Sequence, residues 1–306
     1  MEEAYKRAVK SLNGRLITPY QHEGVAWLLA RELDDKRLRG GILTDEMGLG
    51  KTVQLIAMML GNPLRRTLIV VPKSVVTQWE SEIKRFAPNM SVYVHTGPNR
   101  TQNKDDLRAT VTITTYGCCV VKSTKTNPIS KSDVKPTVLH GIKWDRIILD
   151  EGHEIREAKS KISRSIKLMI GYTKWVVTGT PIFNSMKDFA SISNFIGIKT
   201  DVVQSHTEAV RNIYVLRRTK ADLAQFNSRL ELPPCDFQNV EISMNAEEES
   251  LYMRAFDNGA DTIRTIMASA GNANMHTMEF LKCLLRVRQV MAWPQLFLDG
   301  EEVDPQ

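Results

Sequence analysis

The residues best suited to chemistry form a short glycine-containing segment, TDEMGLGKT, at positions 44–52. Gly48 and Gly50 carry no Cβ, so a ligand can approach the backbone closely, and Lys51 and Thr52 open an apolar helical pattern. A helix that begins at Lys51 directs its free N–H groups into this turn, where they can bind phosphate. In a P-loop the lysine balances β- and γ-phosphate charge, and the next hydroxyl binds Mg²⁺. The segment therefore predicts a nucleotide-phosphate site.

Position 45 departs from the full P-loop pattern GxxxxGK[ST], which requires glycine where this chain has Asp45. An ordinary glycine turn that caps a helix is therefore an alternative interpretation of the segment. An apolar strand pattern, a glycine turn, Lys-Thr and an apolar helical pattern nevertheless follow one another as a phosphate site requires. This order favours nucleotide binding.

A second candidate for chemistry is the pair of carboxylates that ends the run IILDEGH, residues 147–153. If this run is a strand in the same sheet, Asp150 and Glu151 emerge at its tip, near the γ-phosphate of a nucleotide in the loop. Asp150 would hold Mg²⁺ through water, and Glu151 would orient and deprotonate the attacking water. A solvated strand end is the alternative interpretation, and the preceding phosphate loop favours the catalytic one.

The elements that must position these residues alternate along the first 200 positions. Apolar, β-branched-rich runs are separated by helical patterns, and these runs cover 40–45, 66–72, 91–97, 109–117, 144–153 and 174–181. Alternation of this kind predicts an α/β fold, with a parallel sheet covered by helices on both faces and ligands at the carboxyl ends of its strands. Trp79 lies on the apolar stripe of one helical pattern, so we expect it in the core.

Composition limits the class of protein. With 306 residues, 25% charged and 42% hydrophobic, the chain is typical of a globular protein of about two domains. Its first ten residues are too polar for a signal peptide, and no apolar run approaches the ~20 residues that cross a membrane. We therefore expect an intracellular protein without a membrane partner, nuclear if its source is eukaryotic, with a viral origin left open. The four cysteines show no CxxC spacing, so they predict neither zinc nor disulfides.

Charge is unevenly distributed along the chain. Residues 1–230 carry 36 Lys and Arg against 22 Asp and Glu, whereas residues 231–306 carry 5 against 13. The basic part is the part with the phosphate loop, so it could attract a polyanion and steer its approach. Scattered, solvated lysines are the alternative interpretation.

These motifs resemble a known family. TDEMGLGKT, DEGH and TGTP, in that order, resemble motifs I, II and III of the superfamily-two helicases. The blocks around them have the form found in Snf-type ATPases of chromatin remodelling and DNA repair, namely LITPYQHEGVAWLL (glutamine motif), VVPKSVVTQW (Ia), TTYG (Ib), YVLRRTKAD and LLRVRQVMAWPQL. DEGHEIRE is closest to the repair-associated branch that includes the helicase-like transcription factor, where Gly152 replaces the usual alanine. Thr18, Thr44 and Glu157 depart from the family's usual residues.

The resemblance implies roles at the nucleotide. Lys51, Asp150 and Glu151 would be catalytic, ATP would lie on Gly48, Gly50, Lys51 and Thr52, and Mg²⁺ would bind Thr52 and Asp150. Gln21 would read the adenine edge, for which its amide donor and acceptor are suited, although a solvated loop residue is the alternative.

The resemblance also implies contacts to nucleic acid. Four residues would bind the phosphates of one strand without reading bases, namely Lys73, Ser74, Thr115 and Tyr116. Core packing is an equally good interpretation of Tyr116. The residues that would couple the two sites are His153, Thr178 and Thr180, although TGTP could be a simple turn and His153 a buried neutral histidine. Arg217, Arg218 and Lys220 are either a basic face toward DNA or a solvated helix end. The lysine-rich segment 122–143 is predicted to be a surface loop between two strands, which could also track DNA.

In the family, residues 1–200 would be the first RecA-like, ATP-binding lobe, and residues 201–306 a helical protrusion that approaches a second lobe. Clear helical patterns at 247–267 and 275–291 agree with this assignment. The arginines that stabilise the transferring phosphoryl group come from the second lobe, so Arg286 and Arg288 are not assigned that role. We expect this chain to be one half of a motor, with the other half in cis or on another polypeptide.

Three functions remain as hypotheses. The leading one is the ATP-binding half of a double-stranded DNA translocase, a DNA-dependent ATPase that uses ATP and Mg²⁺. It would act in chromatin remodelling, DNA repair or removal of protein from DNA, with a nucleosome or another DNA-bound protein as a further partner. A natural single lobe that senses ATP or docks a partner without hydrolysis is the second hypothesis. An RNA-directed helicase is the third, and the Snf form of motifs Ia and Ib disfavours it.

Overall fold

The computed structural model describes residues 1–34, 38–123, 134–179, 185–224, 237–269, 277–293 and 295. The chain divides into two compact units, Met1–Leu232 and Pro233–Gln306. The predicted boundary after residue 200 therefore falls inside the first unit. The residues that follow it belong there because Val203 and Val210 are buried in a core that the sheet also lines.

A parallel sheet of seven strands forms the centre of the first unit, in the order β3-β4-β2-β7-β8-β1-β9. All the predicted apolar runs form strands, which confirms the predicted α/β fold. β9 is an addition, because two residues are too few to show a pattern. The strands are β1 (Gly40–Leu43), β2 (Thr67–Val71), β3 (Val92–His95), β4 (Val111–Thr115), β7 (Lys143–Asp150), β8 (Ile170–Val177) and β9 (Val215–Leu216).

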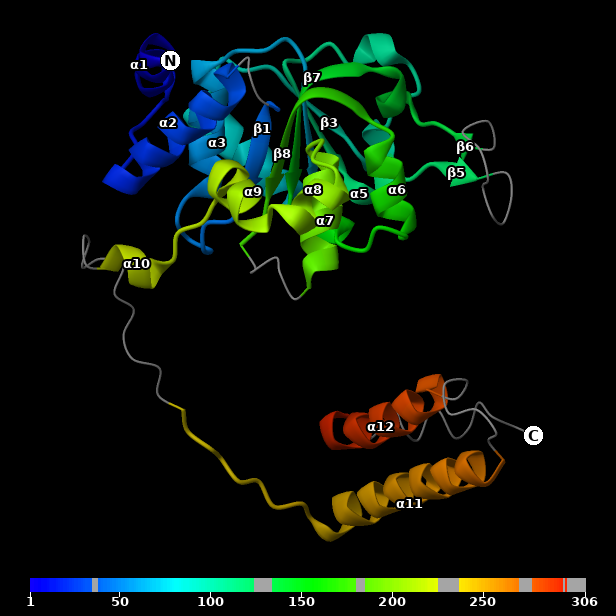
Figure 1. Cartoon of the computed structure of the whole chain (residues 1–306). Helices are drawn as coiled ribbons and strands as arrows, with labels where there is room; N and C mark the ends of the chain where they lie inside the picture. Colours follow the sequence, from blue (N-terminus) through cyan, green and yellow to red (C-terminus); the bar gives the residue numbers. More distant parts are fainter. Residues whose placement is uncertain are drawn as a thin grey trace. The chain divides into compact units, whose positions relative to one another are not determined.

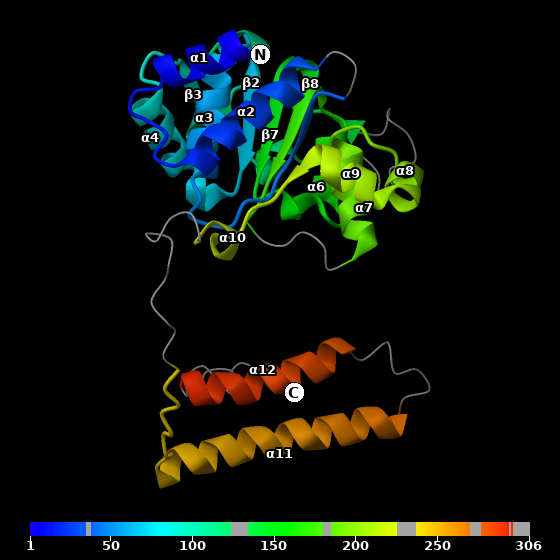
Figure 2. The same cartoon turned by 60° about the vertical axis from the view of Figure 1, so that its left-hand side comes forward.

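Helices cover both faces of the sheet, as predicted (Figure 1 and Figure 2). One core is shared by the sheet with α1 (Glu2–Ser11), α2 (Pro19–Leu33), α3 (Lys51–Gly61) and α4 (Val76–Phe86). The core on the other face is shared with α5 (Tyr116–Cys119), α6 (Lys161–Lys167), α7 (Met186–Phe195), α8 (Thr200–Ser205) and α9 (Thr207–Tyr214). A short helix, α10 (Lys220–Ala224), follows β9.

The carboxyl ends of the strands bring most of the predicted site residues to one edge of the sheet. β1 leads into the loop 44–50, β2 leads into the 3₁₀ turn η1 (Lys73–Val75), and β4 ends at Thr115. Asp150, the last residue of β7, pairs in register with Val177, the last residue of β8. Because all these strands are parallel, the loops that follow them lie at the same edge.

A buried ion pair fastens α2 to the sheet. Arg146 on β7 donates from Nε to Oε1 of Glu32 at 2.6 Å and from Nη2 to Oε2 at 2.5 Å. The indole of Trp175 on β8 donates to the same Oε1 at 2.8 Å, and Arg146 also donates to the carbonyl of Asn62 at 2.8 Å, where α3 ends. The two charged side chains are only 1% and 0% exposed. This network therefore holds α2, α3, β7 and β8 together.

The segment 122–143 differs from the predicted loop at its described ends. β5 (Lys122–Ser123) and β6 (Val134–Lys135) pair with each other in antiparallel orientation, so the loop prediction is wrong there. Residues 124–133 lie outside the described part of the chain. Further 3₁₀ turns are η2 (Gly97–Asn99), η3 (Lys104–Asp106), η5 (Val138–Gly141) and η6 (Gly152–Ile155).

The second unit contains α11 (Ala246–Ser269) and α12 (Thr277–Ala292), which match the two helical patterns predicted for this region. They pack through a small core in which Ala255 and Val290 are buried beside Leu251 and Tyr252. This confirms that a helical part follows the α/β part. Across the described residues of both units, no helix is long and apolar enough to span a membrane.

Candidate nucleotide-binding site

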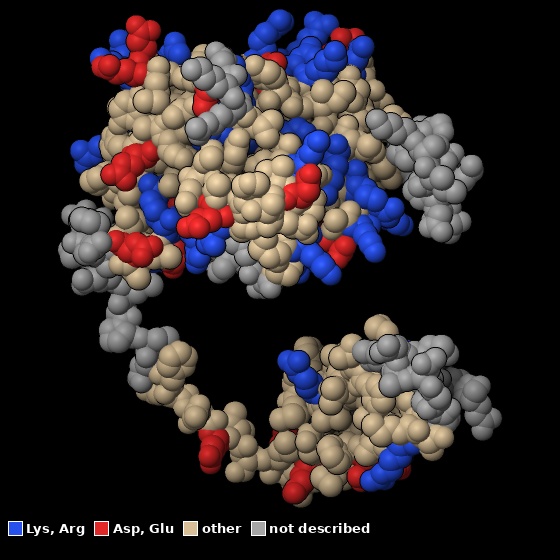
Figure 3. Space-filling model, in the orientation of Figure 1, with Lys and Arg blue, Asp and Glu red and all other residues tan. Residues whose placement is uncertain are grey.

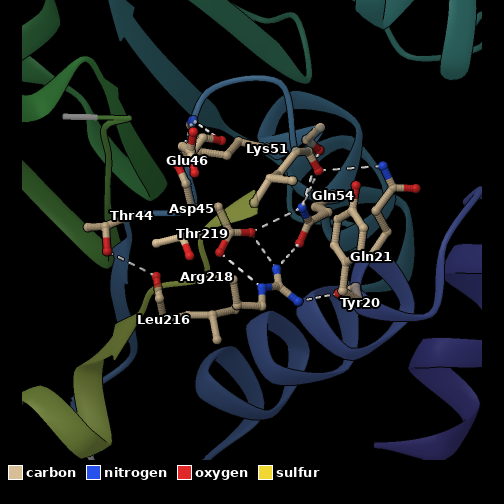
Figure 4. Close-up of polar contacts among 12 residues, drawn as sticks. Tyr20, Gln21, Thr44, Asp45, Glu46, Lys51, Gln54, Leu216, Arg218 and Thr219 are labelled. Atoms are coloured by element: carbon tan, nitrogen blue, oxygen red, sulfur yellow. Dashed lines mark hydrogen bonds and ion pairs between the residues drawn. The ribbon is translucent and has the colours of Figure 1, made fainter. Parts of the chain in front are cut away.

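The phosphate loop connects β1 to α3. Gly48 and Gly50 have φ angles of 89° and 77°, a backbone region that favours glycine, and Gly50 is the N-cap of α3. The ammonium of Lys51 folds back over the loop and donates to the carbonyl oxygens of Asp45 at 2.8 Å and Glu46 at 3.3 Å (Figure 4). The predicted strand, turn and helix are therefore formed, with the Lys51 ammonium held at the loop.

The two predicted carboxylates lie at the end of β7. The indole Nε1 of Trp79 donates to Oδ2 of Asp150 at 2.6 Å, and the backbone N–H of Glu151 donates to Oδ1 at 3.0 Å. Among the described non-glycine residues, Glu151 alone has a positive φ, at 49°. Such a conformation costs about 1–3 kcal/mol and is often found at functional sites. The Glu151 carboxylate lies 3.3 Å from Nδ1 of His153.

Electrostatic interactions join the three catalytic candidates. Burial raises the pKa of Glu151, and the neighbouring Asp150 carboxylate raises it further. Burial also raises the pKa of Asp150, although the hydrogen bond from Trp79 acts to lower it. For Lys51, burial lowers the pKa, although Glu151, Asp45 and Asp150 act in the opposite direction. The ammonium and both carboxylates therefore belong to one site, in which burial disfavours every charge.

The donor atoms of this site suit Mg²⁺. Thr52, the second residue of α3, offers a hydroxyl, and Asp150 offers a carboxylate, which are the hard oxygen ligands that Mg²⁺ prefers. The described residues contain no group of three or more His, Cys, Asp and Glu that could hold a metal ion. Mg²⁺ in a nucleotide site takes only one or two protein ligands, with water and phosphate oxygens as the others.

Gln21 lies on α2 against the phosphate loop. Its Oε1 accepts from the backbone N–H of Ile17 at 2.8 Å, and its Nε2 donates to the carbonyl of Leu49 at 3.5 Å. A Cβ added to Gly50 would lie only 2.5 Å from this Nε2, so a side chain at position 50 would displace the Gln21 amide. With 7% exposure, Gln21 is not a solvated loop residue. Its role in reading adenine stays a prediction.

The TGTP segment passes beside the phosphate loop. Thr178 is fully buried, and its N–H donates to the carbonyl of Leu43, the last residue of β1, at 3.1 Å. A Cβ added to Gly179 would lie 3.1 Å from Nζ of Lys51. Thr180 lies outside the described residues, and a coupling role for both threonines stays a prediction.

The four predicted DNA contacts differ in exposure. Lys73 and Ser74 are exposed in η1, directly after β2. Thr115 and Tyr116 are 8% and 4% exposed, and the Tyr116 hydroxyl donates to the backbone carbonyl of Asp150 at 2.7 Å. Tyr116 therefore has the core position that the sequence left open as an alternative. Exposure supports a phosphate contact only for Lys73 and Ser74.

Two further site residues could not be assigned from the sequence. Trp79 is in the core, as predicted, with 2% exposure, but its bond to Asp150 was not part of that prediction. Arg218 donates to the Asp45 carboxylate and to the carbonyl of Tyr20 (Figure 4), and its side chain is 12% exposed. Neither a DNA-facing nor a solvated position describes it. The residue in the sequence that could have indicated this contact is Asp45, because a carboxylate that becomes buried requires a partner.

A parallel sheet with a phosphate loop after β1 and an acidic pair at the end of β7 defines a P-loop, RecA-like nucleotide-binding lobe. Residues 20–296 match the SNF2-related domain family. Because this match covers most of the chain, the chain belongs to that family, as the sequence motifs had indicated.

Individual relatives agree with this assignment. The chain is 32% identical over 321 residues to the DNA repair protein RAD5 of Candida albicans, in a match that covers 87% of this chain and 29% of RAD5. It is 30% identical over 291 residues to transcription termination factor 2 of Drosophila melanogaster, covering 76% and 26% of the two chains. The Sulfolobus solfataricus SWI2/SNF2 ATPase core in complex with dsDNA has the same fold, with a TM-score of 0.58 and 25% identity over 92% of this chain and 59% of that one. The chain thus spans less than a third of the two curated relatives.

Proposed function

We propose that this chain is the ATP-binding half of an ATP-dependent double-stranded DNA translocase. It would act in chromatin remodelling, DNA repair or removal of protein from DNA. The observation that carries the proposal is the common sheet edge at which the phosphate loop with Lys51, after β1, lies close enough to Asp150 and the strained Glu151, at the end of β7, for their charges to interact. Membership of the SNF2-related family supports ATP as the nucleotide.

The residues of the site divide the work of hydrolysis. Lys51 and the N–H groups at the start of α3 bind the β- and γ-phosphates. Thr52 and Asp150 would hold Mg²⁺, which neutralises charge on the β- and γ-phosphate oxygens when bound. Glu151 orients the attacking water and accepts its proton, and its raised pKa makes it a stronger base than an ordinary glutamate. His153 lies close enough to orient the Glu151 carboxylate.

The proposed partners are double-stranded DNA and a second RecA-like lobe, in cis or in trans. The similarity to an ATPase core solved with dsDNA supports the first of these. Figure 3 shows Lys and Arg side chains gathered over the part of the first unit where α6 lies, which carries Lys161, Arg164 and Lys167. A nucleosome or another DNA-bound protein is a further proposed partner, and the proposed location is the nucleus if the source is eukaryotic.

A nucleotide titration tests the ATP site. Lys51 contacts the phosphates, whereas Glu151 acts on the water, so Lys51→Ala should lose affinity for a fluorescent ATP analogue with Mg²⁺ and Glu151→Gln should keep it. Equal affinity of wild type and Lys51→Ala would contradict the assignment of the phosphate loop.

A salt series tests the DNA partner. Phosphate contacts release counterions, so binding to random duplexes should tolerate any sequence and weaken with salt, with a slope of about −0.9 per phosphate neutralised. Fluorescence anisotropy at several salt concentrations measures this. Absent or salt-insensitive binding would favour the alternative of an ATP-sensing or partner-docking module, and a preference for RNA duplexes would favour the RNA helicase.

A further inference from the structure

Arg218 makes four polar contacts with groups around the phosphate loop. Its Nε donates to Oδ1 of Asp45 at 3.0 Å, and its Nη2 donates to Oδ2 of the same carboxylate and to Oε1 of Gln54 at 2.9 Å. Its Nη1 donates to the backbone carbonyl of Tyr20, the residue before Gln21. The guanidinium therefore joins the loop to α3 and α2, although Arg218 comes from the segment after β9 (Figure 4).

The partners of Arg218 in turn hold the backbone of the loop. Gln54 is fully buried, and its Nε2 lies 3.2 Å from the carbonyl oxygen of Leu49 and 3.4 Å from that of Gly50. The same Nε2 lies 3.4 Å from Oδ2 of Asp45. Arg218 thus orients both Asp45, near the start of the loop, and Gln54, which binds the carbonyl groups at its end.

Backbone contacts place the whole segment around Arg218 against the loop. The N–H of Thr44 donates to the carbonyl of Leu216 at 2.7 Å, and the N–H of Glu46 donates to the carbonyl of Arg218 at 2.9 Å. The N–H of Lys220 donates to Oε2 of Glu46 at 2.7 Å. Residues 44–46 and 216–220 therefore lie side by side. These hydrogen bonds fix the backbone from which the Arg218 side chain extends.

From these contacts we infer that Arg218 is a positioning residue for ATP binding, which acts through Asp45 and Gln54 to hold the phosphate loop in its binding conformation. The inference rests on the proposed function. It explains why Asp45 stands where a P-loop usually has glycine. The Asp45 carboxylate is fully buried, and the two-pronged contact from a guanidinium satisfies both of its oxygens. Loss of either partner leaves the other as a buried charge without its counter-ion.

Variants of this pair test the inference. Arg218→Met, Asp45→Asn and the double variant are titrated with a fluorescent ATP analogue and Mg²⁺, at a temperature where circular dichroism shows each of them folded. Arg218→Met should weaken binding by about tenfold or more, because it removes charged hydrogen bonds that hold the loop. The double variant should bind more tightly than the product of the single effects predicts, because it leaves neither buried charge unpaired.

Controls separate positioning from folding. Arg217→Met removes the adjacent, exposed arginine and should change the affinity by less than about twofold. If Arg218→Met does not fold, Arg218→Lys replaces it, because lysine keeps the charge and loses the planar two-pronged contact. Two results would overturn this inference and leave the proposed function standing. One is a folded Arg218 variant that binds the analogue like wild type. The other is a double variant whose loss of affinity equals the product of the losses in Arg218→Met and Asp45→Asn. Failure of wild type to bind the analogue would overturn the proposed function, and the inference with it.

Discussion

The buried charges of the site lower the stability of the folded protein, and Glu151 is the clearest example. Its pKa is raised by burial and by Asp150, so its ionised form is less favourable in the folded protein than in the unfolded chain. Glu151→Gln should therefore raise the free energy of unfolding near pH 7, by about 1 kcal/mol or less after solvent screening.

The sign of the pH dependence follows from the raised pKa. As the pH falls through the raised value toward the ordinary value of glutamate, folded wild type takes up the proton first. The advantage of Glu151→Gln should therefore shrink on acidification and vanish once both states are protonated. Urea unfolding from about pH 7 to pH 4 measures the difference. The exposed Glu154→Gln is the control, and a difference that grows at low pH would contradict the cause given.

Trp79 is a core residue that also makes a hydrogen bond in the site. Its indole donates to Asp150, so Trp79→Phe removes that hydrogen bond while it keeps most of the apolar volume. If Asp150 binds Mg²⁺ as proposed, loss of the partner that orients its carboxylate should raise the Mg²⁺ concentration needed for ATP-analogue binding by about tenfold. Trp144→Phe is the matched control, because Trp144 is equally buried and donates to Leu139 instead. Equal effects of the two variants would show that packing alone matters.

The sequence identifies those site residues whose role depends on their neighbours in the chain. Lys51 and Thr52 follow their glycines directly, and Asp150 and Glu151 follow an apolar strand. By contrast, Arg218 and Asp45 are separated by 173 positions, and no periodicity links them. An acidic residue in a glycine position indicates that a cation is needed, but only the fold shows which of the many arginines supplies it.

Among the elements, α2 depends on the charge pair that fastens it to β7 and β8. Arg146→Met leaves Glu32 as a buried carboxylate without its ion pair, so it should lower the free energy of unfolding by about 3–5 kcal/mol. Lys84→Met is the control, because it removes an exposed pair with Glu80 and should change stability by about 0.5 kcal/mol or less. Denaturant unfolding measures both. Equal effects would show that the Arg146 network is not important for stability.

Strands and helices follow from the sequence where the pattern is long enough. The run 144–153 shows its strand because its apolar residues are buried on both faces of the sheet, whereas β9 has two residues and shows none. The pairing of β5 with β6 was missed because the segment between them is polar and lysine-rich. Burial of Glu32 and Arg146 was equally hidden, since charged residues are read as exposed unless their partner is known.

For the whole molecule, charge and fold divide near the same place. The first 230 residues carry a net positive charge and the remaining residues a net negative charge. Along the chain, the boundary between the two compact units falls between Leu232 and Pro233. The basic unit contains the phosphate loop, the acidic pair and the exposed Lys73. Attraction of a polyanion and binding of nucleotide are therefore expected in the same unit, which is the arrangement that a DNA-stimulated ATPase requires.

This arrangement leads to a prediction about turnover. In the proposed function Lys51, Thr52, Asp150 and Glu151 would supply the phosphate, metal and water contacts, but none of them is an arginine finger, which is worth roughly 10³–10⁵ in turnover. In the proposed motor, that arginine belongs to the second RecA-like lobe. Residues 1–306 alone should therefore bind ATP with Mg²⁺ and hydrolyse it barely above background, with little stimulation by DNA.

Addition of a second lobe from an SNF2-type ATPase, fused or as a separate chain, should restore DNA-stimulated hydrolysis. Glu151→Gln in this chain should abolish the gain, because the water would then lack its base. Phosphate release, measured with and without the added lobe and duplex DNA, tests both statements. If residues 1–306 alone showed strong DNA-stimulated turnover, the arginine finger would lie within this chain, and the proposed division of the active site between two lobes would be wrong.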